Sequence, residues 1–387
     1  MDDAVDRSLG VVAVAAGCSV RGQQALPSLF DSANLGALTL PNRLVMAPMS
    51  RNRAAADGSP TELMAAYYAQ RATAGLIIAE AASPNRVGTT FAGIPGIYTD
   101  AQIEGWRGVT EVIHGAGGRT FLQIQHGGRV GHPDNIGSVP LAPSPIRLST
   151  PIHTASGPQD AVVPREMTVE EIRATVADFA TAARNAIAAG FDGVEVHSAN
   201  GMLLHQFLAG NTNQRADEYG GSIDNRIRFT LEVVAAVVAA VGPERVGVRI
   251  APGVGANGIA ETDTAALYPA LVEALDGRGL AYLHVVFADP ASPVFRSIRA
   301  GWNGRLIANP MLGWGEPLPV DGGKAAAETL LAAGADLISL GRPFLANPDL
   351  VTRLRDGAPI NQFRDEYFYG GDATGYTDYP VLEPALR

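Results

Sequence analysis

Two hydrogen-bonding side chains, His197 and Asn200, follow a short run of alternating residues in the middle of the chain. Residues 193–197, Gly-Val-Glu-Val-His, alternate as side chains do along a β-strand, so Glu195 and His197 share one face. If the chain turns at Gly201, Asn200 returns beside His197, and two neutral side chains can donate hydrogen bonds to one oxygen. The spacing therefore predicts a clamp for a carbonyl or phenolate oxygen.

A histidine at the end of a strand is also often only a satisfied polar group. The residues that follow favour a functional role, because they form an amide-rich run without apolar periodicity, as in a binding loop. That run contains Gln206, Asn211, Asn213, Gln214 and Arg215.

The elements that position this loop follow a repeated pattern of strand and helix. Short apolar runs with strand character occur at 44–47, 76–79, 120–124, 193–197, 246–250, 282–286, 305–308 and 337–340. Helical patterns lie between them, at 168–189, 226–241 and 262–276, and the first begins with a capping box of Thr168 and Glu171. Eight such repeats predict an α/β fold, a single-domain (β/α)8 TIM barrel with long βα loops. An open doubly wound sheet is the alternative, but the glycine run expected after its first strand is absent.

Composition and charge narrow the classes of partner. Of 387 residues 47% are hydrophobic and 18% charged, and 29 Lys and Arg against 39 Asp and Glu give a net charge of -10. An acidic chain repels phosphate polymers and anionic lipid, so we expect a small-molecule substrate, with neither nucleic acid nor membrane as a partner. The single cysteine, Cys18, fits a reducing compartment and predicts a cytoplasmic protein.

Residues 9–18 are as apolar as the core of a signal peptide, which leaves export as the alternative location. The flanking residues Asp2, Asp3 and Asp6 carry the wrong charge for an export signal, and the run is too short to span a bilayer. We therefore expect a disordered N-terminal extension at 1–25, a barrel at 26–380 and a C-terminal tail at 381–387.

The stretch HSANGMLLHQFLAGNTNQRADEYGGSIDNR, residues 197–226, closely resembles the old yellow enzyme family of flavin-dependent ene-reductases. Further matches extend the resemblance from about residue 29 to residue 380. It implies tightly bound FMN, NADPH or NADH as hydride donor, and reduction of the C=C bond of an α,β-unsaturated carbonyl or nitro compound. It also implies that His197 and Asn200 are the catalytic residues that bind the substrate's oxygen.

The resemblance assigns the flavin ring to the ends of the first three strands. Pro48, Met49 and Ser50 match the first flavin contact, where a hydroxyl lies near the C4 oxygen. Ala81 matches a position where a small side chain lets the flat ring approach the backbone. Gln123 matches a flavin-binding glutamine, and its amide can both donate to and accept from the pyrimidine edge of the ring.

Two arginines complete the cofactor site that the resemblance implies. Arg249 is a charge on a buried-strand pattern and so requires a partner, which is either an ion pair or, as in the family, the N1 edge of the flavin. Gly341 and Arg342 offer a backbone N–H and a guanidinium to the phosphate. One departure is Pro310, which lacks an N–H where related sequences usually have a glycine pair.

Four residues match the family's substrate pocket: Phe91, Gln125, Met202 and Tyr369. Phe91 stands where members often have a tyrosine, and Met202 stands where most have a proton-donating tyrosine. Because a thioether cannot donate a proton, a redox-neutral isomerase or a biosynthetic tailoring flavoenzyme remains an alternative. A flavin-free barrel lyase or a binding protein is the alternative from another class. The irregular segment 132–164 is typical of a lid. We expect no metal, and a monomer or homodimer.

Overall fold

The computed structural model describes residues 27–313 and 315–383, which form a closed barrel of eight parallel strands. The strands follow one another round the ring in chain order: β3 (Leu44–Met46), β4 (Leu76–Ala82), β5 (Thr120–Ile124), β10 (Gly193–Ser198), β11 (Val246–Ile250), β12 (Tyr282–Ala288), β13 (Leu306–Pro310) and β14 (Leu337–Leu340). β14 pairs in parallel with β3, which closes the ring. The predicted (β/α)8 barrel and all eight strands are confirmed. The predicted extension at 1–25 and most of the tail at 381–387 lie outside the described residues, and the three-part division of the chain stays a prediction.

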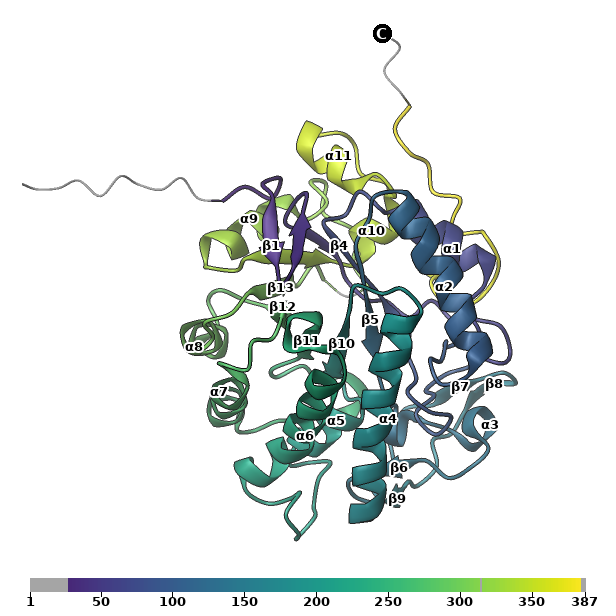
Figure 1. Cartoon of the computed structure of the whole chain (residues 1–387), viewed down its shortest axis with the longest axis vertical. Helices are drawn as coiled ribbons and strands as arrows, with labels where there is room; N and C mark the ends of the chain where they lie inside the picture. The colour runs from purple at the N-terminus through teal and green to yellow at the C-terminus, as the bar shows by residue number, and fades with distance from the viewer. Residues whose placement is uncertain (1–26, 314, 384–387) are drawn as a thin grey trace, which may run out of the picture.

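Helices surround the barrel, as Figure 1 shows. They are α1 (Glu62–Ala69), α2 (Asp100–Gly115), α4 (Val169–Ala188), α6 (Ile223–Val241), α7 (Thr264–Leu275), α8 (Pro293–Gly301), α9 (Lys324–Ala332) and α11 (Leu350–Asp356). Helix α4 begins with the predicted capping box, in which Thr168 and Glu171 each bond to the other's backbone N–H. In the described part of the chain, no helix is both long enough and apolar enough to cross a membrane.

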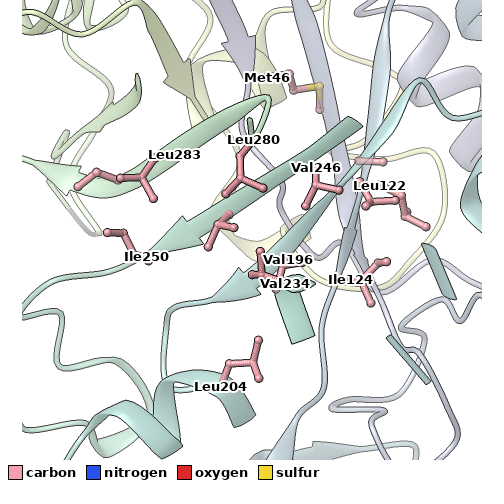
Figure 2. Close-up of a cluster of buried hydrophobic side chains, with 14 of the residues drawn as sticks. Met46, Leu122, Ile124, Val196, Leu204, Val234, Val246, Ile250, Leu280 and Leu283 are labelled. Atoms are coloured by element: carbon pink, nitrogen blue, oxygen red, sulfur yellow. The ribbon is translucent and has the colours of Figure 1, made fainter. Parts of the chain in front are cut away.

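The outward faces of the strands are apolar and pack against these helices. Figure 2 shows this layer, with Leu122, Ile124, Val196 and Val246 on the strands near Val234 of α6. Each of these side chains is buried, and burial of an aliphatic side chain of this size contributes about 1.5 to 3 kcal/mol. Because side chains alternate along a strand, the layer directs the residues between them into the barrel.

The interior of the barrel is apolar at the N-terminal ends of the strands. Phe121 and Tyr282 fill this half, and their ring centroids lie 5.7 Å apart. Gly193 and Gly247 leave the space for them, since a Cβ atom at either position would overlap the facing ring. The hairpin of β1 (Ala33–Leu35) and β2 (Leu38–Leu40) belongs to the same apolar cluster and covers this end.

The long connection between β5 and α4 contains several short elements, which lie together at the lower right of Figure 1. They are η1 (Gly128–Val130), α3 (Pro133–Ile136), β6 (Leu141–Ala142), β7 (Ile152–Thr154), β8 (Gly157–Gln159) and β9 (Arg165–Glu166). Strands β7 and β8 pair as an antiparallel hairpin within the segment that the sequence showed only as irregular. This connection is therefore ordered by a hairpin of its own.

The C-terminal segment docks beside the end of β3 through three buried arginines. Arg51 donates to the carbonyl oxygens of Phe368 and Gly375, at 2.8 and 2.9 Å. Arg53 and Arg71 bond in the same way to carbonyls of residues 344–345, 367, 372, 374 and 376. Neutral acceptors thus hold three guanidinium groups, and residues more than 300 positions apart become neighbours.

Candidate active site

The side chain of His197 lies at the C-terminal end of β10, where His197 pairs in register with Arg249 of β11. It is buried, and its Nδ1 atom has no hydrogen-bond partner among the described residues. Burial first, and then the charge of Arg249, hold the pKa of His197 well below its usual range. His197 is therefore a neutral imidazole that can donate a hydrogen bond without carrying charge.

Asn200 is held in a left-handed turn directly after the strand. Its φ is 55°, and Gly201 follows with a φ of 75°, so the predicted turn at Gly201 is confirmed. A Cβ atom at Gly201 would lie 2.5 Å from the carbonyl oxygen of Ala256, which explains the need for glycine there. The Oδ1 atom of Asn200 is buried and, among the residues described, has no partner.

Neighbouring side chains hold the backbone of this turn. Asn257 donates from Nδ2 to the carbonyl oxygen of Asn200 at 2.8 Å, and the N–H of Gly201 donates to Nδ1 of His205 at 3.1 Å. His205 therefore carries its hydrogen on Nε2, which lies 3.2 Å from Glu261. These supports come from helix α5 (Leu203–Leu208) and the loop after β11. The sequence analysis missed Asn257, His205 and Glu261 as parts of the site.

Arg249 is buried in the barrel without a direct partner. It forms no hydrogen bond or ion pair within the described residues, and its Nε atom is fully buried. Burial lowers the pKa of Arg249 most strongly, while the nearby charge of Glu195 raises it. The structure thus does not provide the ion pair that the sequence left open, and the guanidinium is available to an anionic or electron-rich group.

Gln123 belongs to a chain of hydrogen bonds across the barrel. Its Nε2 donates to Glu195 Oε1 at 2.7 Å, and Glu195 Oε2 lies 2.8 Å from Nδ1 of His284. The Nε2 atom of His284 lies 2.7 Å from the hydroxyl of Ser339. Sequence analysis did not assign Glu195, His284 or Ser339 to the site, although alternation placed Glu195 on the same face as His197.

The residues expected at the flavin ring come together from β3, β4 and β14. Ala47 donates its N–H to the carbonyl of Leu340 at 3.0 Å, which brings Pro48, Met49 and Ser50 beside the end of β14. A Cβ atom on Gly341 would lie 3.1 Å from the sulfur of Met49. Ala81 is buried where the pairing of β4 with β5 shifts register. The ends of these strands are lined by small or apolar groups that a flat ring can approach.

Arg342 is turned toward the loop after β13. Its guanidinium donates to the carbonyl oxygens of Glu316 at 2.8 Å, Leu312 at 2.9 Å and Gly313, and it lies over the ring of Phe363. The predicted phosphate contact of this side chain stays a prediction. Pro310 ends β13 and pairs with Ala288 of β12.

The expected pocket residues divide between two places. Met202 belongs to an apolar cluster with Val130, Leu148, Ile152 and Ala161, and Phe91 packs against it. Gln125 is buried just after β5. Tyr369 is not part of that cluster, since it lies on the docked C-terminal segment, 56% exposed, with its ring 4.7 Å from that of Phe368.

The donor set at this end of the barrel fits FMN and an oxygen-bearing substrate. Neutral donors at His197 and Asn200 suit an oxygen on which negative charge grows, and Arg249 suits a ring that becomes anionic. Each of the three has a buried polar atom without a partner in the described part of the chain, which is costly unless a ligand meets it.

Comparison with known proteins agrees with this geometry. The model of the NADH:flavin oxidoreductase / NADH oxidase family matches residues 28–361. A probable flavin mononucleotide-dependent alkene reductase of Leishmania infantum is 41% identical over 360 residues, which are 90% of this chain and 96% of that protein. The 12-oxophytodienoate reductase 1 of Oryza sativa subsp. japonica is 39% identical over 389 residues, which are 96% of this chain and 97% of that protein.

Solved structures show the same relationship. Morphinone reductase has a TM-score of 0.87 and 42% identity, with 94% of this chain and 98% of that chain covered. The old yellow enzyme homologue from Zymomonas mobilis has a TM-score of 0.86 and 39% identity, with 92% and 100% covered. The chain therefore belongs to the NADH:flavin oxidoreductase / NADH oxidase family and is a flavin oxidoreductase related to the old yellow enzymes.

Proposed function

We propose that the protein uses FMN and hydride from NADH or NADPH to reduce the C=C bond of an α,β-unsaturated carbonyl or nitro compound. The observation that carries the proposal is that His197, Asn200 and Arg249 present, at the C-terminal end of the barrel, buried polar atoms that have no partner within residues 27–313 and 315–383. Relatives named as alkene reductase and 12-oxophytodienoate reductase support the same chemistry, and a morphinone reductase structure contains tetrahydroNAD.

The cofactor, when bound, supplies the hydride that it accepts from the nicotinamide. Gln123 and Arg249 would hold the pyrimidine and N1 edges of the ring, and the segment of Pro48, Met49 and Ser50 would contact it. Gly341 and Arg342 would bind the phosphate, and the guanidinium of Arg342 would then have to leave the loop carbonyls for the phosphate oxygens.

His197 and Asn200 bind the carbonyl or nitro oxygen of the substrate. Negative charge grows on that oxygen as the β-carbon receives hydride, so their hydrogen bonds are stronger in the transition state than in the ground state. The depressed pKa of His197 keeps it neutral, and it therefore remains a hydrogen-bond donor that does not transfer its proton.

The α-carbon receives its proton from water or from a hydroxyl such as that of Tyr369, since Met202 cannot donate one. A positioned general acid contributes roughly 100- to 10,000-fold, so weakly activated alkenes should react slowly. Met202→Tyr should accelerate the weak acceptor and make α-deuteration in deuterated solvent more stereoselective, with flavin reduction unchanged. Unchanged rates and labelling would mean that another group already supplies the proton. Net isomerisation without consumption of nicotinamide would favour the redox-neutral alternative.

The deciding experiment is to identify the cofactor and then assay turnover. Purified protein should release one FMN per chain on denaturation, and riboflavin should bind far more weakly because it lacks the phosphate. Steady-state kinetics with both nicotinamides and a panel of enones then test the reaction. A colourless protein that FMN cannot reconstitute would remove the whole mechanism.

We also propose a cytoplasmic location, supported by the acidic composition and the single cysteine, and a monomeric or homodimeric state. Cell fractionation and light scattering of the purified protein test these two statements. Recovery from the culture medium would contradict the first, and a larger assembly would contradict the second.

A further inference from the structure

The chain of hydrogen bonds from Gln123 through Glu195 and His284 to Ser339 crosses the barrel interior from β5 to β14. All four side chains are buried, and three of them are fully inaccessible. Glu195 is the centre of this chain, because each of its carboxylate oxygens has one partner, Gln123 Nε2 and His284 Nδ1. A buried carboxylate with both oxygens bonded fixes the donors that face it.

The charges of this chain follow from its surroundings. Burial raises the pKa of Glu195, whereas the hydrogen bond from His284, the charge of Arg249 and the hydrogen bond from Gln123 lower it. The pKa of His284 is lowered, chiefly by burial. Glu195 is therefore an anion and His284 is neutral, with its hydrogen on Nδ1 toward Glu195 and Nε2 accepting from the hydroxyl of Ser339.

The anion determines which way the amide of Gln123 points. A carboxylate only accepts hydrogen bonds, so the Nε2 side of the amide must face Glu195 and the Oε1 atom must point away from it. Gln123 consequently presents an acceptor, together with its second N–H, to the ring edge that it binds. A neutral amide in place of Glu195 could face Gln123 in either sense.

The same anion acts on Arg249. Glu195 pairs in register with Gly247 of β11, one inward-facing position below Arg249, and its charge raises the pKa of that guanidinium. Arg249 has no nearer partner among the described residues. Part of its positive potential is therefore offset by Glu195 before any ligand reaches it.

We propose that Glu195 is a positioning residue with two effects on the cofactor: it orients the amide of Gln123 toward the flavin, and its charge lowers the flavin's reduction potential by offsetting Arg249. This inference rests on the proposed function, because it requires FMN at Gln123 and Arg249. Its consequence is that reduced FMN binds less tightly, relative to oxidised FMN, than Arg249 alone would allow. The bound flavin is then a stronger hydride donor.

Glu195→Gln separates charge from shape. The Oε1 atom of the new glutamine can accept from Gln123, and its Nε2 atom can donate to Nδ1 of His284. His284 then carries its hydrogen on Nε2 and donates it to the hydroxyl of Ser339, so every hydrogen bond of the chain can persist. The affinity for reduced relative to oxidised FMN should rise at least tenfold, which is about 30 mV for a two-electron couple. The measurement is equilibration of the holoprotein with a redox dye. The ratio of the affinities for reduced and oxidised flavin should shift equally when riboflavin replaces FMN, because Glu195 acts on the ring and not on the phosphate.

Glu195→Asp keeps the charge and shortens the side chain. The ratio should stay within about threefold of wild type, while the affinity for oxidised FMN should fall roughly tenfold or more, as expected for the loss of a hydrogen bond to a charged group. Glu261→Gln is a matched control, since Glu261 is also buried against a histidine, His205, but outside this chain. It should leave the ratio unchanged.

An unchanged or lower ratio in Glu195→Gln would overturn the proposal. If that variant does not fold, unchanged FMN affinity in Glu195→Asp would overturn it instead, because orientation of Gln123 requires the full-length side chain. Failure of the wild-type protein to bind FMN is a different result, which refutes the proposed function.

Discussion

The two halves of the barrel interior differ sharply although the same strands build both. At the N-terminal ends of the strands Phe121 and Tyr282 pack together, and two residues further along the same strands stand Gln123 and His284. The lower half, which contains the two rings, is held by close packing, although the buried hydroxyl of Tyr282 has no hydrogen-bond partner within the described residues. The upper half, with Gln123 and His284, is polar, and Arg249 lies there without a partner among the residues that the structure describes.

The lower half of the barrel interior therefore contributes mainly to stability, and the upper half contributes mainly to binding and catalysis. Close-packed rings gain from burial alone, whereas each unpaired buried polar group costs about 1 to 3 kcal/mol. The upper half is therefore completed only by a ligand, and binding of that ligand should raise the stability of the whole barrel.

The largest effect is expected from the lower half. Phe121→Ala removes a buried ring and should lower the free energy of unfolding by about 3 to 5 kcal/mol, measured by urea denaturation of the apoprotein. FMN affinity of the folded protein should change little. Gln123→Ala is the control from the same strand and should show the reverse pattern, with weaker FMN binding. If Phe121→Ala and Gln123→Ala changed stability and FMN affinity to the same extent, the proposed difference between the two halves would be wrong.

The oxygen clamp gives the next largest effect, on turnover and on phenol binding. His197→Ala or Asn200→Ala should each lower kcat for enone reduction by about 100- to 1,000-fold, since loss of one oxyanion donor costs roughly 3 to 4 kcal/mol. FMN should remain bound, and the charge-transfer band expected with para-substituted phenols should disappear. Phenol binding and enone reduction that both survive in the double variant would refute the clamp.

The pH dependence of the free energy of unfolding tests whether the buried histidines stay neutral in the folded protein. The pKa of His126 is lowered to about 4 by burial, from an ordinary 6.5. Below pH 6.5 His126 is protonated in the unfolded chain but stays neutral in the folded chain. The free energy of unfolding therefore decreases as pH falls, by about 3 kcal/mol in total near pH 4. His197 and His284 shift in the same direction. Glu80 opposes them, since its pKa of about 7 adds stability as pH falls from 7 to 4.5.

His126→Asn isolates this contribution, because Asn Oδ1 can still accept the hydrogen bond from Gly128. The free energy of unfolding, measured from pH 7 to pH 4, should fall less steeply in the variant. Parallel curves for the two proteins would show that His126 titrates normally.

The smallest effect concerns the support of the clamp. Asn257→Gly keeps the left-handed conformation at a φ of 50° but removes the hydrogen bond to the Asn200 carbonyl. A lost hydrogen bond of about 1 kcal/mol predicts roughly fivefold lower kcat/KM for enones. Flavin reduction by nicotinamide should be unaffected. A variant with wild-type kcat/KM would mean that His205 alone holds the turn.

Sequence reasoning located the barrel because its strands are short apolar runs, and α4 carries its own start signal in Thr168 and Glu171. It also predicted an oxygen clamp of His197 and Asn200 from their spacing at the end of one strand, and this clamp stays a prediction. Resemblance supplied the role expected of Gln123, which no pattern of a single strand reveals.

The supporting residues could not be predicted in the same way. Glu195, His284 and Ser339 lie on β10, β12 and β14, and their contact depends on how far each strand is inserted in the barrel. The orientation of Arg342 depends on a loop without periodicity. Such contacts follow from strand register and loop conformation, which local sequence patterns do not encode.

The docking of residues 367–376 on Arg51 and Arg53 has a consequence for biosynthesis. The first barrel strand pairs with the last, and its arginines bind carbonyls that emerge from the ribosome more than 300 residues later. During translation one edge of β3 therefore remains unpaired until β14 has been made. The nascent chain cannot assemble the whole of the proposed ring-binding surface before β14 has been made, so we expect the cofactor to bind late in synthesis or after it.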